Sequence, residues 1–381
     1  MSSIDTILSD AVANQDVLFV VAMAGNRASV TYSGAAGEAA DGRAAGEDTV
    51  FRVFSMTKAV GSLAAMIAID RGKLDVDTPV EEILPEFADL QVLDRFEDGR
   101  PVMRAPRTKA TLRQLPTHPR GLEYEFCNAD DARYMEATGH PTILSGTRES
   151  LNYPLMTDPG TRWGYGPGID WLGQAVEKVD GRRIDRYCHE EIFEPLGLTS
   201  TAFEVSDDME SRLASVYARG PDGTFGPFEL APPPQPEVYG MGHALYASAP
   251  DYLRFLRLLL NGGELDGHRL ISADALRRLL ADHMNGLAFE KMVTAVPDVT
   301  ADCDPFPQVG RTHSFGFLRN EDDLPGMRAA GSQTWAGVLN THYWFDPTSD
   351  VAAVIMTQSL PFVEPRYMQL YEAYERAVYA A

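Results

Sequence analysis

The chain has 381 residues, 44% hydrophobic and 23% charged, which is the composition of an ordinary soluble globular protein with the length for two subdomains. Its net charge of −22 is spread along the chain as single acidic residues, which argues against nucleic acid or an anionic membrane as a partner. The first residues lack a basic and apolar leader, and no later apolar run approaches about 18 residues, so a cytoplasmic enzyme is expected.

The three cysteines are far apart and lack the spacing of a zinc site, and the histidines show no metal-ligand motif. We therefore expect three free thiols, no metal and no other cofactor. The cysteines are Cys127, Cys188 and Cys303.

The first predicted unit is a β-hairpin. Residues 17–24 are almost entirely apolar, Gly25-Asn26-Arg27 has turn chemistry, and residues 28–34 have the pattern of a second strand. The stretch from Gly34 to Asp48 lacks periodicity, so a surface loop is expected there. The hairpin is expected to belong to a sheet beneath the helix that follows.

That helix is expected to organise the rest of the fold. A β-leaning run ends at Phe54, and the apolar residues after Ser55 recur at helical spacing as far as Gly72, which can cap the helix. Ser55 and Lys58 are three residues apart and share one face of the helix. A buried lysine loses solvation of its charged form and can accept a proton from a hydroxyl, while a helix N-terminus favours an oxyanion. The pair predicts a nucleophile beside its base.

Residues 73–162 predict short helices and loops. A helix start is indicated by the acidic residues and proline of 75–84, and 111–114 has capping-box spacing. Pro116 and Pro119 limit any helix there to a turn or two, so residues 117–124 are expected to form a loop. Residues 125–162 carry no strong pattern beyond turn signals.

Helices are expected again further along the chain. A Gly-rich turn around Tyr165 enters an amphipathic pattern that reaches Val179, and another helix is predicted over 184–193. Residues 231–236 read Ala-Pro-Pro-Pro-Gln-Pro and predict an extended linker.

The remaining elements turn from helical to β-rich. Two helices with serine N-caps are followed by strands and by a final helix. The helices are expected to begin at Ser248 and Ser272, the strands to cover 314–318, 338–345 and 351–358, and the final helix to cover 364–379.

Strands at both ends of the chain with helices between them predict an α/β (α+β) fold. Both termini would build one antiparallel sheet flanked by helices. On this basis residues 1–72 and 240–381 form an α/β subdomain, residues 73–239 form an inserted, mainly helical subdomain, and residues 1–381 make a single catalytic domain.

A set of motifs is spread over nearly the whole chain: a Ser-x-x-Lys on a buried helix, a tyrosine in a tight loop before a later helix, and a Trp-x-Gly on a C-terminal strand. The motifs occupy Phe54–Lys58, Thr111–Leu115, Asp158–Tyr165, Ile169–Gly173, Ile192–Gly197 and Gly331–Gly337. With them the chain resembles the serine β-lactamase-like superfamily, specifically the family VIII carboxylesterases, which are close to class C β-lactamases and lovastatin-type acyltransferases. The resemblance implies a β-lactamase/penicillin-binding-protein-like fold and a carboxylesterase activity.

The resemblance also implies roles for individual residues. Ser55 would be the nucleophile and Lys58 its base partner, and Tyr165 would relay the proton to the leaving group. The backbone N–H groups of Ser55 and Val338, the latter at the edge of the sheet, would form the oxyanion hole.

Substrate binding is expected to involve Trp335 and Gly337, with Tyr124 as a pocket-lining tyrosine. In β-lactamases the matching strand carries Lys-Thr-Gly, whose charge and hydroxyl attract the carboxylate of penicillins, whereas this chain has Trp335-Ala336-Gly337. The substrate expected is therefore a small molecule, a short-chain neutral carboxylic ester.

Three departures from the family's pattern concern the surroundings of the site, and one of them is Tyr239–Tyr246, which stands where the family commonly has a Gly-rich segment. The family commonly reads Leu-Leu-Thr-His-Thr-Ser-Gly-Leu where this chain has Leu-Pro-Thr-His-Pro-Arg-Gly-Leu over 115–122, so the loop Pro116–Arg120 is expected to be reshaped. Class C enzymes have asparagine two residues after the tyrosine, where this chain has Pro167.

Other functions fit the sequence less well. An α/β-hydrolase is disfavoured because no Gly-x-Ser-x-Gly occurs, and the glycine pairs lack the third glycine of a dinucleotide-binding motif. A β-lactamase, a D-aminopeptidase or other amide hydrolase, and an acyltransferase remain alternatives within the same fold. A non-enzymatic penicillin-recognising module is disfavoured by the intact Ser/Lys/Tyr set.

Overall fold

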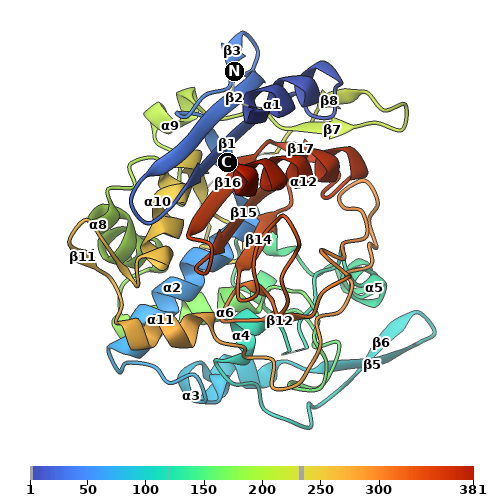
Figure 1. The fold of residues 1–381 in the computed structure, drawn as a ribbon. Helices are drawn as coiled ribbons and strands as arrows, with labels where there is room; N and C mark the ends of the chain where they lie inside the picture. Colours follow the sequence, from blue (N-terminus) through green and yellow to red (C-terminus); the bar gives the residue numbers. More distant parts are fainter. Residues whose placement is uncertain (1–2, 120, 231–235) are drawn as a thin grey trace.

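A large antiparallel sheet brings the two ends of the chain together. The computed structural model describes residues 3–119, 121–230 and 236–381, and within them this sheet has eight strands in the order β12-β13-β14-β15-β16-β1-β2-β3. Figure 1 shows the blue N-terminal strands beside the red C-terminal ones. The strands are β1 (Phe19–Gly25), β2 (Val30–Ala40), β3 (Arg43–Ala44), β12 (Arg311–His313), β13 (Leu318–Asn320), β14 (Gln333–Gly337), β15 (Thr341–Asp346) and β16 (Val351–Met356).

Strand β1 is the central link between the two termini. It pairs with β16 on one side and β2 on the other, so that Val21 lies opposite both Met356 and Ala35. Every residue of β1 is buried, as its continuous apolar sequence requires of a strand covered on both faces. The predicted hairpin and the antiparallel sheet flanked by helices are confirmed.

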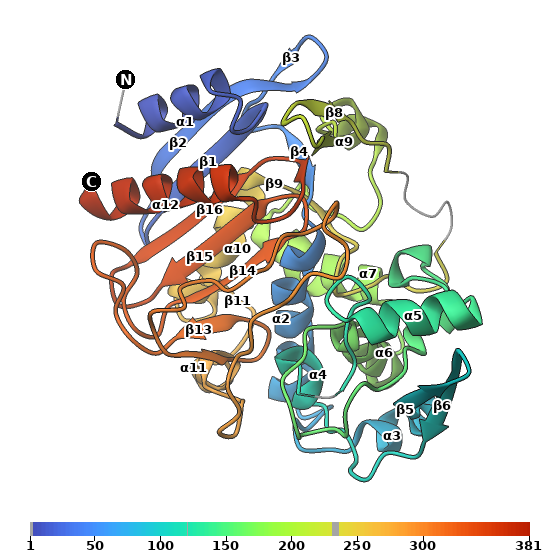
Figure 2. The ribbon, with the colours of Figure 1, turned by 90° about the vertical axis from the view of Figure 1, so that its right-hand side faces the viewer.

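Helices cover both faces of the sheet. α1 (Ser3–Ala13) and α12 (Pro365–Ala380) lie side by side over one face, where Leu8, Val20 and Tyr374 belong to one apolar cluster (Figures 1 and 2). The opposite face packs against α10 (Ala249–Leu260), which begins at its predicted cap, Ser248. The sheet is therefore the middle layer of a three-layer arrangement.

Helix α2 (Thr57–Asp70) lies at the centre of the fold. Its residues from Thr57 to Ile69 are all buried, as expected for a helix that is apolar nearly all round. Its exposed last residue, Asp70, accepts hydrogen bonds from the backbone N–H and hydroxyl of Ser272, the predicted cap of α11 (Ala273–Leu280). The prediction of a buried helix that begins just after Ser55 is confirmed.

Met241 is inserted between helix α6 (Gly168–Asp180) and α2, where a glycine of each helix faces it. A Cβ on Gly61 of α2 would lie 2.9 Å from Met241 Cβ, and a Cβ on Gly173 of α6 would lie 2.6 Å from Met241 Cγ. The two glycines thus leave room for Met241 between the helices. This insertion fixes the loop that contains Gly242 beside the start of α2.

The chain between α2 and β9 forms the lower part of the molecule in Figure 1, in cyan and green, and a separate edge near β2. Its elements are mostly short. They are α3 (Val80–Ile83), β5 (Val92–Glu97), β6 (Arg100–Arg104), α4 (Gln114–Thr117), α5 (Ala129–Thr138), α7 (Ile184–Cys188), a π-helical turn over His189–Phe193, α8 (Glu194–Leu196), α9 (Asp207–Ser211), β7 (Tyr217–Arg219) and β8 (Phe225–Pro227).

Small strand pairs tie the remaining loops to the body of the protein. β4, immediately before Ser55, pairs with β9, and β7 pairs with β8 and β17. These strands are β4 (Val50–Arg52), β9 (Tyr246–Ser248), β10 (Glu264–Leu265), β11 (His268–Arg269) and β17 (Ser359–Leu360).

Several predicted boundaries are wrong. The expected loop from Gly34 to Asp48 is largely strand, because β2 continues past the small residues to Ala40 and turns into β3. The strand expected over 314–318 is instead the link between β12 and β13. The strand expected over 338–345 begins only at Thr341, because Val338–Asn340 forms the turn between β14 and β15 and Asn340 has a φ of 59°. The expected linker over 231–236 lies almost wholly outside the described residues.

Helix α5 was not predicted, and it contains a buried acid. Its N-cap, Asn128, accepts hydrogen bonds from the N–H groups of Asp130 and Asp131. The side chain of Asp131 is fully buried, and neither carboxylate oxygen has a hydrogen-bond partner among the described residues. Burial, followed by the nearby charges of Glu125 and Glu123, raises the pKa of Asp131 to about 8, so this carboxyl is protonated at neutral pH.

Replacement Asp131→Asn is expected to stabilise the protein at alkaline pH. The folded-state pKa of about 8 exceeds the ordinary value of 3.8, so the stability that the protonated acid contributes is complete below about pH 4 and lost as pH rises through about 8. The amide cannot ionise, so its unfolding free energy should exceed that of the wild type by at least about 1 kcal/mol at pH 8, and match it near pH 4.

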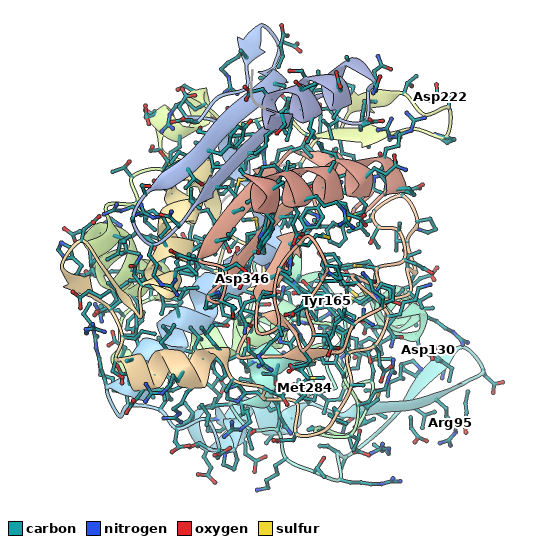
Figure 3. All side chains as sticks on the ribbon, in the orientation of Figure 1. Arg95, Asp130, Tyr165, Asp222, Met284 and Asp346 are labelled. Carbon is teal, nitrogen blue, oxygen red and sulfur yellow. The ribbon has the colours of Figure 1, made fainter. Side chains whose placement is uncertain are left out.

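Urea unfolding at pH 4.5 and 8 measures this effect. Asp130→Asn is the matched control, because Asp130 is the exposed neighbour on the same helix (Figure 3). An unchanged pH dependence in Asp131→Asn would contradict the assignment.

None of the helices in the described residues is both long and apolar enough to cross a membrane.

Candidate active site

Ser55 lies in a tight turn between strand β4 and helix α2. Residues Phe54–Met56 form a single 3₁₀ turn, and the helix continues from Thr57. Phe54 has a φ of 41°, a left-handed conformation that costs a non-glycine residue of the order of 1–3 kcal/mol. Strain of this kind is concentrated at functional positions, and here it turns the chain immediately before Ser55.

Lys58 lies one turn after Ser55 and is 1% exposed. Its Nζ lies 3.1 Å from Ser55 Oγ, and it donates to the hydroxyl of Tyr124 at 3.1 Å and to the carbonyl of Gly242 at 2.9 Å. It also lies 4.8 Å from the centre of the Tyr165 ring. The amine is therefore held against the serine by partners from three separate parts of the chain.

Tyr165, in the loop before α6, also contacts Ser55. Its hydroxyl donates to Ser55 Oγ at 2.7 Å and accepts a hydrogen bond from Trp335 Nε1 at 3.2 Å. Burial raises the pKa of this phenol well above its ordinary value, so the hydroxyl keeps its proton at rest. In Figure 3 Tyr165 lies toward the middle of the molecule, away from Arg95 and Asp222 at its edges.

Two contacts of the lysine were not foreseen from the sequence. Tyr124 does not line the cavity at Ser55; it is 3% exposed, and its hydroxyl contacts Lys58 instead. Gly242 accepts from Lys58 through its carbonyl and donates its N–H to Asp170 Oδ1 at 2.7 Å. A Cβ on Gly242 would lie 2.9 Å from the Tyr124 hydroxyl, so only glycine fits between these groups.

The end of β14 lies directly against the turn before Ser55. A Cβ on Gly337 would lie 2.2 Å from the carbonyl oxygen of Val53, so the absence of a side chain permits this approach. The hydroxyl of Thr341 on β15 also donates to that carbonyl, at 3.4 Å. β14 is an interior strand in the sheet order, but β13 pairs only with Gln333 and Thr334, so the segment that leads to Val338 has a strand partner on one side alone.

A cavity of about 300 Å³ opens at Ser55. Its walls come from Phe126 and Cys127, from residues 292–308, from the end of β14, and from residues 362–372 where α12 begins. Trp335 forms part of the wall, next to Tyr165 and Ser55. The space is suited to a small, mainly apolar molecule.

The charges that line this cavity are negative. Asp302, Asp304 and Glu372 contribute to its walls, where Asp302 pairs with Lys291 and Asp304 with Arg311, and no arginine or lysine lines it among the described residues. His342 also lines it, and burial lowers the pKa of this histidine to about 3, so the ring is neutral. The cavity therefore favours a neutral ligand over an anion.

A cluster of aromatic rings packs against Tyr165. The ring of His118, which follows α4, lies 4.9 Å from the ring of Tyr165, 4.9 Å from that of His313 and 6.2 Å from that of Trp335. The loop after Pro116 was predicted, but this packing was not. It holds Tyr165 and Trp335, whose polar atoms are joined by a hydrogen bond, in their positions beside the cavity.

Comparison with known proteins gives this geometry a family. The model of the family described as Beta-lactamase matches residues 4–376 of the chain. The chain belongs to the Beta-lactamase family. It is an enzyme of the serine hydrolase and acyltransferase type found on this fold, as the sequence motifs predicted.

Similar proteins include esterases and acyltransferases. The chain is 30% identical over 348 residues to monacolin J acid methylbutanoyltransferase of Aspergillus terreus, a match that covers 87% of this chain and 82% of the relative. It is 29% identical over 327 residues to lovastatin esterase of Penicillium rubens, covering 82% and 80% of the two chains. Among solved structures, a mutant of simvastatin synthase from A. terreus superimposes with a TM-score of 0.84 at 26% identity, over 99% of this chain and 96% of the other.

Proposed function

We propose that the chain hydrolyses short-chain neutral carboxylic esters through an acyl-enzyme on Ser55. The observation that carries the proposal is the pair of contacts on one oxygen: Ser55 Oγ meets Lys58 Nζ at 3.1 Å and the Tyr165 hydroxyl at 2.7 Å, at the mouth of a cavity. A hydroxyl held by a buried amine and a protonated phenol is equipped for nucleophilic catalysis and proton transfer.

In the first step Ser55 Oγ attacks the carbonyl carbon of the ester and its proton passes to Lys58. The electron pair of the carbonyl moves onto its oxygen, which becomes the oxyanion. The backbone N–H groups of Ser55 and Val338 stabilise that oxyanion, and the close approach at Gly337 brings the end of β14 beside the turn that contains Ser55.

In the second step the carbonyl re-forms and the bond to the alkoxy oxygen breaks. Tyr165 donates its proton to that oxygen and regains one from Lys58, so the alcohol leaves neutral. Water then attacks the acyl carbon and gives one proton to Lys58. The bond to Ser55 Oγ breaks, Ser55 receives a proton through Tyr165 and Lys58, and the carboxylic acid is released. Tyr165 is suited to this exchange because it holds its proton at rest and lies within hydrogen-bond distance of Ser55.

Substrate choice follows from the walls of the cavity. Trp335 supplies a flat apolar surface, and the described lining offers no arginine or lysine to pair with an anionic acyl or alkoxy group. The partner proposed is therefore a small neutral ester.

Comparison of three substrate classes tests this proposal. Wild-type enzyme should hydrolyse p-nitrophenyl acetate and butyrate faster than nitrocefin and faster than D-amino acid p-nitroanilides. Preference for nitrocefin would indicate a β-lactamase instead, and preference for the anilides an aminopeptidase.

Acyl transfer is a second candidate, favoured by the similarity to a methylbutanoyltransferase. In that reaction an alcohol replaces water in the attack on the acyl-enzyme. The ratio of new ester to free acid, measured by mass spectrometry with an added alcohol, separates transferase from hydrolase.

Replacement of the two tyrosines that meet the Ser/Lys pair should have unequal effects. Tyr165→Phe removes the proton relay and is expected to lower kcat on the order of 10² or more, with little change in KM. Tyr124→Phe removes only one of the three partners of Lys58 and should lower kcat by about tenfold or less. Steady-state kinetics on p-nitrophenyl butyrate measures kcat and KM of both variants. A near-normal kcat in Tyr165→Phe would show that Tyr165 only packs at the site and relays no proton.

A further inference from the structure

A second cavity of about 310 Å³ lies on the other side of the turn that holds Ser55. It shares no lining residue with the first: Ser55 lines one cavity, and its neighbour Phe54 lines the other. The walls of the second cavity are mainly apolar and include Phe203, Tyr239 and Tyr246. Neither the proposed hydrolysis nor its residues account for this space.

The cavity contains one cation without an acidic partner. Arg52, half-buried at the end of β4, donates from its two terminal nitrogens to the carbonyls of Ala214 and Leu230 at 3.2 and 3.3 Å. Its guanidinium lies 5.9 Å from the centre of the Tyr246 ring, and no carboxylate among the described residues pairs with it. Burial lowers the pKa of Arg52, the direction expected for a cation kept from water without an anion beside it.

No other ionisable group of the cavity forms an ion pair with Arg52 in the described residues. Glu204 also lines the cavity, but its carboxylate accepts a hydrogen bond from the hydroxyl of Tyr239, and the guanidinium of Arg183 lies 4.7 Å from the centre of that same ring. Burial lowers the pKa of His243 to about 3, so this ring is neutral. Its Nδ1 is buried without a hydrogen-bond partner among the described residues.

We propose that this second cavity binds a small apolar monocarboxylate, whose carboxylate pairs with Arg52 and whose hydrocarbon body lies against Phe54, Phe203 and Tyr246. A guanidinium is the side chain best matched to a carboxylate, and a partly buried charge pair is stronger than one in water. The apolar walls accept the rest of the ligand. The two cavities thus differ in their cations: no arginine or lysine lines the one at Ser55 among the described residues, whereas Arg52, without a carboxylate partner, lines this one.

Binding of octanoate and of its neutral analogue octanamide to the intact protein, measured by calorimetry, tests the site without any turnover. Octanoate should bind the wild type more tightly than octanamide. Arg52→Gln should weaken octanoate binding at least about tenfold and leave octanamide unaffected. Equal affinity of the two ligands for the wild type, or an octanoate affinity that does not depend on Arg52, would overturn the proposal.

A second pair of variants covers the case in which Arg52→Gln fails to fold. Leu144 also lines the cavity and is 41% exposed, so it tolerates polar replacements. Leu144→Glu adds a negative charge and should weaken octanoate binding severalfold relative to Leu144→Gln, its neutral control. Equal octanoate affinity in these two variants would also overturn the proposal.

Discussion

p-Nitrophenyl butyrate should be hydrolysed with a kcat/KM at least about 10³-fold above that for penicillin G, a difference of roughly 4 kcal/mol. The residues that face the reacting group on β14 are Trp335 and Ala336, which offer neither positive charge nor hydroxyl to a substrate carboxylate. A carboxylate placed there loses water without gaining a partner, which costs several kcal/mol. Glu372, which lines the same cavity and forms no ion pair among the described residues, opposes it further.

The substitution Trp335→Lys provides the matched test of this argument. It places a cation at the position where the β-lactamases that the chain resembles carry lysine. The KM for penicillin G should fall, and the difference in kcat/KM between the two substrates should therefore become smaller. Comparable rates on the two substrates in the wild-type enzyme would contradict the assigned preference and favour the β-lactamase alternative.

Lys58→Ala is expected to lower kcat on the order of 10² or more, with a small change in KM. The amine is the only group within hydrogen-bond distance of Ser55 that is proposed to take its proton in the first step. Its removal also leaves the Tyr124 hydroxyl and the Gly242 carbonyl without this donor. The fall should therefore appear in acylation, as a slower pre-steady-state release of p-nitrophenol.

Lys73→Ala is the control for the loss of a lysine as such. Lys73 is 40% exposed, and its partner Asp180 stays paired with Arg182 when the lysine is removed, so the replacement should leave kcat unchanged. Thermal unfolding of both variants verifies that they are folded. A kcat close to wild type in folded Lys58→Ala would show that another group accepts the proton.

The contact between Ser55 and Lys58 could be predicted from the sequence because it is local. Ser55 and Lys58 are one helical turn apart, and the apolar pattern that follows them predicts a buried helix. Tyr165 could be placed because a Gly-rich turn leads into the strong amphipathic pattern of α6. Gly337, which allows the close approach of β14 to Val53, was also part of the motif Gly331–Gly337.

Contacts between distant loops could not be predicted from local patterns. Tyr124 contacts Lys58 across 66 positions, and the Gly242 loop is held by Met241 between two helices that lie far from it in the sequence. The cavity wall over 292–308 has almost no regular structure, so no periodicity reveals it. Helix α5 was missed because its composition is mainly polar and its stability depends on the cap at Asn128.

The central claim, a covalent intermediate on Ser55, is tested most directly by labelling with a p-nitrophenyl phosphonate ester followed by peptide mass spectrometry. We predict one adduct per chain, located on Ser55, with loss of esterase activity in proportion to labelling, and neither adduct nor activity in folded Ser55→Ala. An unlabelled Ser55 in inactivated enzyme, or full activity in Ser55→Ala, would contradict it.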